Sequence, residues 1–223
     1  MPPQPIDCRF PAAVQELWTE LSTEVTWIHG RWIIYRRLFG TNKERVDLLN
    51  ESAGTVSWIL QDLLLNDVQL SISKLADPAD DRNRRNLSLR RLQTDLRSAG
   101  EVALANNLEH RLTRFEVSCS QIRHRRNKWI AHTDLGTQLA ARAVPLSGPS
   151  RAEIEAALAA LREALDCVEM HYTGTRIAYE HFVMRSDGEH LLMELGRAHR
   201  YRRLVADGTI PKDDLGRPFP KGV

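Results

Sequence analysis

Apolar residues recur every three or four positions along almost the whole sequence, which is the period of an amphipathic α-helix. Strand-like alternation never persists for more than a few residues. The spacing predicts six helices, over about residues 12–38, 42–75, 86–99, 101–130, 150–185 and 189–205. The chain of 223 residues is therefore expected to form an all-α antiparallel helical bundle with an extra C-terminal helix and tail.

Composition divides the chain into three segments. Residues 1–11 contain four prolines and are expected to form a flexible leader. Residues 12–185 hold the predicted bundle, and residues 186–223 hold a basic helix followed by a Gly/Pro-rich tail. The length suits one domain with a tail rather than two full domains.

Local signals mark several helix ends. Asp77-Pro78 ends the second helix, because proline disfavours the helical conformation in the residue before it. Asn86 is expected to cap the third helix at its N-terminus. Ser150 and Glu153 have the spacing of a capping box, in which each side chain satisfies an exposed amide of the other residue.

Charge and cysteine usage exclude several protein classes. The 31 Lys and Arg nearly balance the 29 Asp and Glu, unlike a histone-like polycation or an acidic disordered tail. No apolar stretch approaches the roughly 20 residues of a membrane span, and the N-terminus lacks the features of a signal peptide. The three cysteines, Cys8, Cys119 and Cys167, are widely separated and lack metal-ligand spacing. We expect a cytoplasmic protein with neither a disulfide framework nor a bound metal or cofactor.

The segment 121–134 is the most informative part of the sequence. It carries four fixed positive charges and two histidines, with no acid before Asp134. Its basic residues are Arg123, Arg125, Arg126 and Lys128. Cations near a helix C-terminus are favoured by the helix dipole, so ordinary helix stabilisation explains part of this pattern.

Arg126 is expected to face inward. The predicted apolar stripe of the fourth helix consists of Leu104, Leu108, Leu112, Phe115, Cys119 and Ile122. Arg126 follows Leu108 by 18 residues, which is five whole helical turns, whereas Arg125 is rotated by 100° from that line. An inward arginine needs an anion, a carboxylate or a partner surface, and a salt bridge to Asp62 or Asp67 is one alternative.

His132 supplies a second candidate group. A neutral histidine can accept the proton of a ribose 2′-hydroxyl, while a guanidinium holds the phosphate. Asn127 can hydrogen-bond a phosphate oxygen or orient the histidine. On a straight helix Arg126 and His132 lie 120° apart, so they converge only if the helix loosens near Ala131 or a second copy contributes. The structural alternative for His132 is a helix C-cap.

This segment resembles the HEPN domains (higher eukaryotes and prokaryotes nucleotide-binding). Their signature is an arginine, a polar residue and a histidine after four to six intervening residues, here Arg126, Asn127 and His132. Arg176 with His181 and Arg185 with His190 also have the spacing, but Ile177 is not polar and Arg185 lies at a helix break. The fuller string over residues 126–134 is similar to the abortive-infection U-type branch, as are residues 70–78 and 86–92. The resemblance covers roughly residues 12–185.

The resemblance implies a fold and an activity. HEPN domains are all-α bundles, and their active nucleases pair two copies so that a composite cleft cleaves RNA, leaving a 2′,3′-cyclic phosphate and a 5′-hydroxyl without a metal. Carried over, Arg126 and His132 are catalytic. The supporting residues are Asn127, Arg125, Lys128 and Asp134. Arg125 also fits the spacing, so the choice between the two arginines stays open.

Further basic residues favour contact with RNA. Arg123 and Trp129 lie beside the motif, and Trp129 can stack a base, although packing is its commoner use. The predicted sixth helix carries a basic cluster: Arg197, His199, Arg200, Arg202 and Arg203. Such a cluster binds an RNA backbone or is simply a solvated helix face. We expect an endoribonuclease of microbial defence with RNA, a second copy and an antitoxin as partners, or else a noncatalytic HEPN module that binds RNA, a nucleotide or a protein.

Overall fold

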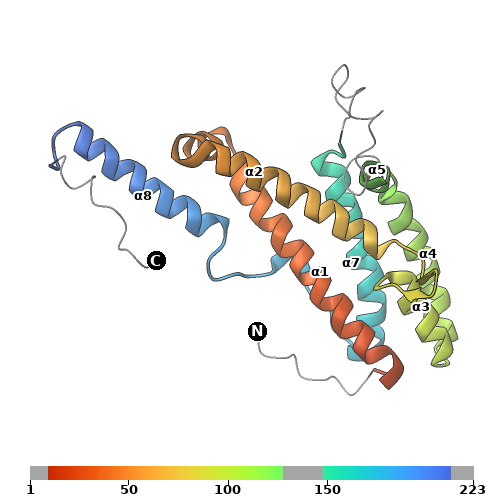
Figure 1. Ribbon diagram of the computed structural model, residues 1–223. Coiled ribbons are helices and arrows are strands. Elements are labelled where there is room, and N and C mark those ends of the chain that lie inside the picture. The colour runs from red at the N-terminus through yellow and green to blue at the C-terminus, as the bar shows by residue number, and fades with distance from the viewer. Residues whose placement is uncertain (1–9, 128–147, 212–223) are drawn as a thin grey trace. The chain divides into compact units, whose positions relative to one another are not determined.

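Helices form nearly all of the fold, as the apolar period predicts (Figure 1). The computed structural model describes residues 10–127 and 148–211. Its described α-helices are α1 (Ala12–Phe39), α2 (Lys43–Leu75), α3 (Leu89–Ser98), α4 (Val102–Ser118), α5 (Ser120–Arg125), α7 (Arg151–Thr173) and α8 (Gly188–Ala206). They form two compact units, one from the described parts of residues 1–31 and 65–182, the other from those of 32–64 and 183–223.

The core of the first unit lies where α4 packs against α7 and α3 packs against α4. The predicted stripe of α4 and α5 is buried throughout, from Leu104, 5% exposed, to Ile122, which is fully buried. Its counterpart on α7 is equally buried: Ile154, Ala157, Leu158, Leu161, Ala164, Leu165 and Val168. These apolar faces hold the helices together and fix which polar residues remain at the surface.

The link between α2 and α3 is a small hairpin rather than an irregular loop. Strand β1 (Asp80–Asp81) pairs with β2 (Arg84–Arg85) in antiparallel register. Arg82 and Asn83 form the turn with positive φ angles of 47° and 78°, as a tight two-residue hairpin turn requires.

The predicted cap of the third helix was wrong. The Asn86 side chain donates to the main-chain oxygen of Pro78 at 2.9 Å, which closes the hairpin loop. Ser88 therefore caps α3 instead, with its hydroxyl accepting from the Arg91 amide at 3.2 Å.

Two helices are shorter than predicted. The fourth predicted helix is interrupted at Cys119, which separates α4 from α5, and the Ser118 hydroxyl donates to the Phe115 carbonyl beside this break. The fifth ends at Thr173 rather than near residue 185, because Gly174 adopts a left-handed conformation (φ 69°) that terminates α7. A single 3₁₀ turn, Tyr179–His181, follows.

The apolar residues of α2 are buried along only part of the helix. Ala53 has non-helical dihedral angles and kinks the helix. Val56 and Leu63 follow the apolar period of the helix but are 64% and 60% exposed, whereas Val68 and Ile72 are fully buried. The apolar pattern thus identified the helix, but not which part of it is covered.

In the second unit, α8 is fixed by polar contacts at its N-terminus. Asp187 accepts from the amides of Glu189 and His190 as the N-cap and forms an ion pair with Arg37. Arg45 forms an ion pair with Glu189. None of the helices that the structure describes is long and apolar enough to cross a membrane.

Candidate functional site at the end of α5

The predicted motif begins where α5 loses its regular form. α5 ends at Arg125, and Arg126 and Asn127 continue in a wider π-helical turn. Such turns are rare and recur at functional sites. His132 lies outside the described residues, as do the other predicted site residues Lys128, Trp129 and Asp134.

Arg126 binds a carboxylate from the end of α2. Its Nη1 lies 3.0 Å from Oδ1 and 3.1 Å from Oδ2 of Asp77. Its Nε donates to Oδ1 of Asn127 at 3.1 Å. The side chains of Arg126 and Asp77 are 18% and 24% exposed, so both are largely removed from solvent. The predicted inward arginine is therefore partly buried, with its charge compensated.

Arg123 contacts the same end of α2. Its Nη1 donates to the main-chain oxygen of Ala76 at 3.1 Å, and its Nη2 lies 3.6 Å from Oδ1 of Asp77. Arg123 and Arg126 thus converge on the C-terminal end of α2, where the helix dipole also favours positive charge. Arg123 thus helps to hold the end of α5 against the end of α2.

The partner of Arg126 differs from the two acids considered from the sequence. Asp67 lies 2.7 Å from Nε of Arg31 rather than near Arg126. In the sequence, Asp77 carries only the signal of a residue that precedes a helix-ending proline. Because Pro78 turns the chain away from the helix axis, Asp77 is released from the helical face and can point back toward α5.

One edge of the Arg126 guanidinium remains free of bonded acceptors among the described residues. Its hydrogen bonds to Asp77 and Asn127 use Nη1 and Nε, whereas an arginine has five N–H donors. The N–H groups of Nη2 can therefore donate to a phosphate while Asp77 and Asn127 hold the rest of the group in position.

Arg125 points to a different place. A Cβ atom built on Gly148 would lie only 2.0 Å from Nη1 of Arg125. The guanidinium of Arg125 therefore rests directly on that glycine. Its Nε is buried and has no hydrogen-bond partner among the described residues. The two neighbouring arginines are thus separated by their surroundings: Arg126 meets an acid, and Arg125 meets backbone.

A shallow pocket of about 390 Å³ adjoins Arg123 and is also lined by Arg90, Gln93 and Glu116. Arg90 is already compensated, since it donates to Glu116 at 2.6 and 2.8 Å and to Glu109 at 2.7 Å. These hydrogen bonds, led by that to Glu116, raise the pKa of Arg90. The pocket therefore presents a neutralised ion cluster rather than a free basic surface.

The basic residues of the hairpin and α3 are similarly engaged. Arg91 lies 3.0 Å from both Asp80 and Asp95, and Arg85 lies 3.3 Å from Asp95. The density of arginine in this part of the sequence thus serves largely to connect the hairpin to α3.

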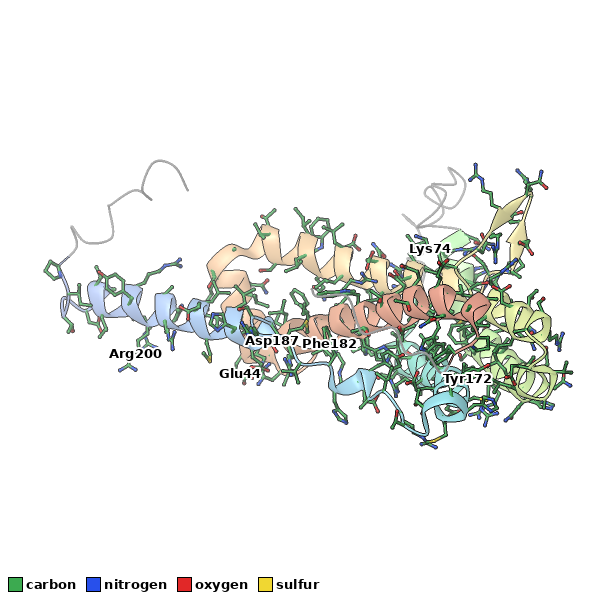
Figure 2. All side chains as sticks on the ribbon, turned by 90° about the horizontal axis from the view of Figure 1, so that it is seen from below. Glu44, Lys74, Tyr172, Phe182, Asp187 and Arg200 are labelled. Atoms are coloured by element: carbon green, nitrogen blue, oxygen red, sulfur yellow. The ribbon has the colours of Figure 1, made fainter. Side chains whose placement is uncertain are left out.

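The basic cluster of α8 is more open. Arg200 and Arg203 are exposed, and Arg200 projects from the helix (Figure 2). Arg197 is paired with Glu194 at 2.5 Å, and Nδ1 of His199 lies 3.4 Å from Glu51. The predicted RNA-contacting residues of α8 therefore have the exposure that the role requires. They belong to the second unit, whereas Arg126 belongs to the first.

Comparison with known proteins identifies the family. The family model for AbiU2, a HEPN family, matches residues 12–193, which is most of the chain. No curated protein and no solved structure matches the chain. The match confirms the resemblance found in the sequence, and the all-α fold agrees with it. The chain therefore belongs to the AbiU2 family of abortive-infection HEPN proteins.

Proposed function

We propose that this protein is a metal-independent endoribonuclease of microbial defence whose active site combines Arg126 and His132 from two copies of the chain. The observation that carries the proposal is the Arg126 guanidinium, held by Asp77 and Asn127 with its Nη2 edge unbonded among the described residues. Arg126 follows the helix break at Cys119 by seven residues and precedes His132, the histidine of the family motif, by six.

The proposed reaction is a transesterification within RNA. His132 accepts the proton of the 2′-hydroxyl, and the 2′-oxygen attacks the adjacent phosphorus. The bond from phosphorus to the 5′-oxygen then breaks, and the leaving oxygen takes a proton from an imidazolium, giving a 2′,3′-cyclic phosphate and a 5′-hydroxyl. Arg126 stabilises the extra negative charge on the phosphate oxygens in the transition state.

A two-fold homodimer completes this proposal. His132 follows Arg126 by six positions, and a regular helix would point the two side chains apart. A π-helical turn begins at Arg126, and in the proposed dimer a second copy brings another arginine and histidine to the same groove. Asn127, Arg125, Lys128 and Asp134 are assigned supporting roles. The exposed Arg200 and Arg203, with Arg123 and Trp129, are assigned to RNA, and the cytoplasm is the proposed site of action.

The direct test is RNA cleavage in EDTA. Purified wild-type protein is incubated with structured and unstructured RNA, beside Arg126→Ala, Arg126→Lys and His132→Ala. We expect cleavage by the wild type alone, with products ending in a cyclic phosphate, and a loss of about 100-fold or more in the alanine variants.

The sequence itself provides matched controls. Arg185 and His190 have the same kind of spacing, but Arg185 is exposed in the loop before α8. Arg185→Ala and His190→Ala should cleave like the wild type. Cleavage that requires added Mg²⁺, or that persists in both Arg126→Ala and His132→Ala, would refute the assignment.

A noncatalytic HEPN module is the second candidate, and one observation favours it. Asp77 already compensates the charge of Arg126, as in a purely structural ion pair. That function predicts RNA, nucleotide or partner-protein binding, including an antitoxin, without any cleavage product. This candidate would be favoured if the wild type leaves the RNA uncleaved and Arg126→Ala still binds it.

A further inference from the structure

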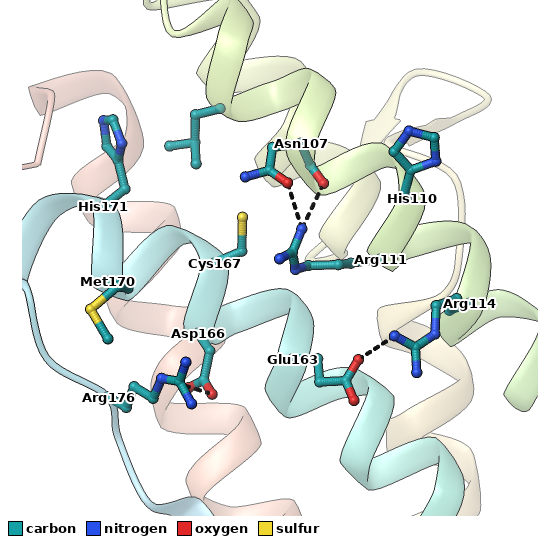
Figure 3. A pocket seen from close by; sticks show the side chains of 11 residues that line it. Asn107, His110, Arg111, Arg114, Glu163, Asp166, Cys167, Met170, His171 and Arg176 are labelled. Carbon is teal, nitrogen blue, oxygen red and sulfur yellow. Dashed lines mark hydrogen bonds and ion pairs between the residues drawn. The ribbon is translucent and has the colours of Figure 1, made fainter.

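A second candidate ligand site lies between α4 and α7, apart from the motif arginine. The two helices and the segment after α7 enclose an open pocket of about 640 Å³, within the usual range for small-molecule sites (Figure 3). None of its lining residues belongs to α5. The whole pocket lies in the first unit, on elements whose packing is set by the core beneath them.

The pocket forms because the buried stripes of α4 and α7 leave their flanking residues at the surface. Asn107 and Arg111 lie on one wall, and Cys167 and Met170 on the other. Leu104, only 5% exposed, adds a further apolar side chain to the lining. The site therefore combines an apolar portion with polar groups, as a ligand that is part organic and part charged requires.

Arg111 provides the uncompensated charge. Its Nη1 donates to the main-chain oxygen of Asn107 at 3.0 Å and to Oδ1 of the same residue at 2.6 Å. Both acceptors are neutral, and no carboxylate forms an ion pair with Arg111 among the described residues. The two hydrogen bonds orient the guanidinium, while its Nε and Nη2 remain free to donate to a planar pair of anion oxygens.

Two further arginines line the pocket, and each forms an ion pair. Arg114 lies 2.7 Å from Glu163, with side chains 68% and 48% exposed, and Arg176 lies 3.9 Å from Asp166. An exposed pair such as Arg114–Glu163 contributes little stability, and the 3.9 Å separation makes Arg176–Asp166 a loose pair, so both arginines can also attract a bound anion. Three arginines thus face two carboxylates, so one positive charge remains even with the lining histidines, His110 and His171, neutral.

The surroundings strengthen the electrostatics of the site. Burial raises the pKa of Asp166 above its usual value despite the nearby Arg176, and burial likewise raises that of the Cys167 thiol. Asp166, whose side chain is 25% exposed, and the half-buried Cys167 are thus partly shielded from water. Charge interactions with an anion bound beside these two groups are less screened than on an open surface.

We propose that this pocket binds a phosphate monoester of mononucleotide size, with the phosphate on Arg111 and the organic portion against Leu104 and Met170. Arg114 and Arg176 contribute further positive charge at the rim. This site goes beyond the proposed nuclease function, because it requires neither Arg126 nor His132. It gives the protein a means of sensing a small phosphorylated metabolite.

Binding is tested by calorimetry on the full chain with four probes: AMP, adenosine, inorganic phosphate and a short 5′-phosphorylated RNA. We expect saturable binding of AMP, weaker binding of inorganic phosphate and little binding of adenosine. Arg111→Gln should weaken AMP binding by at least about tenfold, since hydrogen bonds to charged groups are among the stronger ones. Arg111→Lys should retain part of the affinity because it keeps the charge but loses the planar donors.

Arg84→Gln is the matched control, because Arg84 is exposed on β2 and does not line the pocket. It should bind AMP like the wild type. Circular dichroism and thermal melting establish that each variant is folded, and Asn107→Ala serves as a second variant that frees Arg111 without removing it. Asn107→Ala should also weaken AMP binding.

A second measurement locates the ligand. Cys167 is half-buried in the pocket, and Cys119 is fully buried. In a Cys8→Ser variant, a thiol reagent therefore reports on Cys167. AMP should slow the labelling of Cys167 in this protein and not in its Arg111→Gln derivative. RNA cleavage by Arg111→Gln should equal that of the wild type, which separates this site from the nuclease.

Four outcomes would overturn the proposal. They are no saturable AMP binding at millimolar concentration, equal binding of adenosine and AMP, unchanged AMP affinity in Arg111→Gln, and unchanged Cys167 labelling at saturating AMP. Binding of the phosphorylated RNA without binding of AMP would assign the pocket to RNA and would equally refute a small-ligand site.

Discussion

Arg126 and Asp77 lie 49 residues apart in sequence, yet Nη1 of the arginine is 3.0 Å from one carboxylate oxygen and 3.1 Å from the other. This ion pair connects the end of α5 to the end of α2. Asp77 belongs to the segment 70–78 and Arg126 to the segment 126–134, both of which resemble the abortive-infection U-type HEPN proteins. One residue from each of these two family-like strings thus meets the other.

The Arg126–Asp77 pair should show energetic coupling. Each single variant, Asp77→Asn or Arg126→Gln, leaves one partly buried charge unpaired and should lower the free energy of unfolding by about 1–3 kcal/mol. The double variant should lose less than the sum of the two, with a coupling of about 1 kcal/mol in urea unfolding. Asp81→Asn, on the exposed hairpin, is the control. Strict additivity would mean that the pair does not form in solution.

His29 should make the protein less stable in mild acid. Its Nδ1 lies 2.9 Å from the Val25 carbonyl, and its Nε2 lies 3.1 Å from Nη1 of Arg162. Since arginine only donates, Nε2 accepts and the ring is neutral. Burial, together with Arg162 and against the opposing charges of Glu180 and Glu155, lowers the pKa of His29 below its ordinary 6.5.

The sign of this pH dependence follows from proton binding. The unfolded state binds the proton near pH 6.5, whereas the folded state resists it to lower pH. The stabilisation of the folded state by neutral His29 is therefore fully present above pH 6.5. It is lost as the pH falls through the depressed pKa of the folded state. Urea unfolding from pH 8 to 5 should show the stability gap between wild type and His29→Gln narrowing with acid. A constant gap would contradict this, and His181→Gln, at an exposed position, is the control.

Cys119 should be inert in the native protein. The thiol is fully buried, and burial raises its pKa to about 12. Because the thiolate is the reactive species, a thiol reagent at pH 8 should not modify Cys119 until the protein unfolds. In a Cys8→Ser background, mass spectrometry should locate the native-state label on Cys167 alone. Labelling of Cys119 at the rate of a free thiol would show that the α4–α5 break opens.

The capping box at the start of α7 should contribute measurable stability. The Ser150 hydroxyl accepts from the Glu153 amide at 3.2 Å, and the Ser150 amide donates to the Glu153 carboxylate at 2.7 Å. Ser150→Ala should cost about 1 kcal/mol and lower Tm by about 2–4 °C, measured by thermal melting. Ser150→Asp should restore most of it, since aspartate is also an effective N-cap. Equal melting of all three proteins would exclude a capping contribution.

The sequence was sufficient for features that depend on neighbouring residues. The helical period located the helices, and the spacing of Leu104 through Ile122 identified the buried face of α4 and α5. The Ser150 capping box and the helix end at Asp77-Pro78 were predicted for the same reason. Each of these follows from local geometry, such as 100° of rotation per residue or the missing amide of proline.

Only the tertiary structure decided which distant residues meet. Asp77, rather than Asp62 or Asp67, reaches Arg126 because Pro78 redirects the chain at the end of α2. Arg125 and Arg126 differ by one position in sequence, but packing sends one to Gly148 and the other to Asp77. Ala53 interrupts α2 within an unbroken apolar pattern, and Val56 and Leu63, which follow it, are exposed. Periodicity fixes the face of a helix, whereas the partner of that face depends on how separate helices pack.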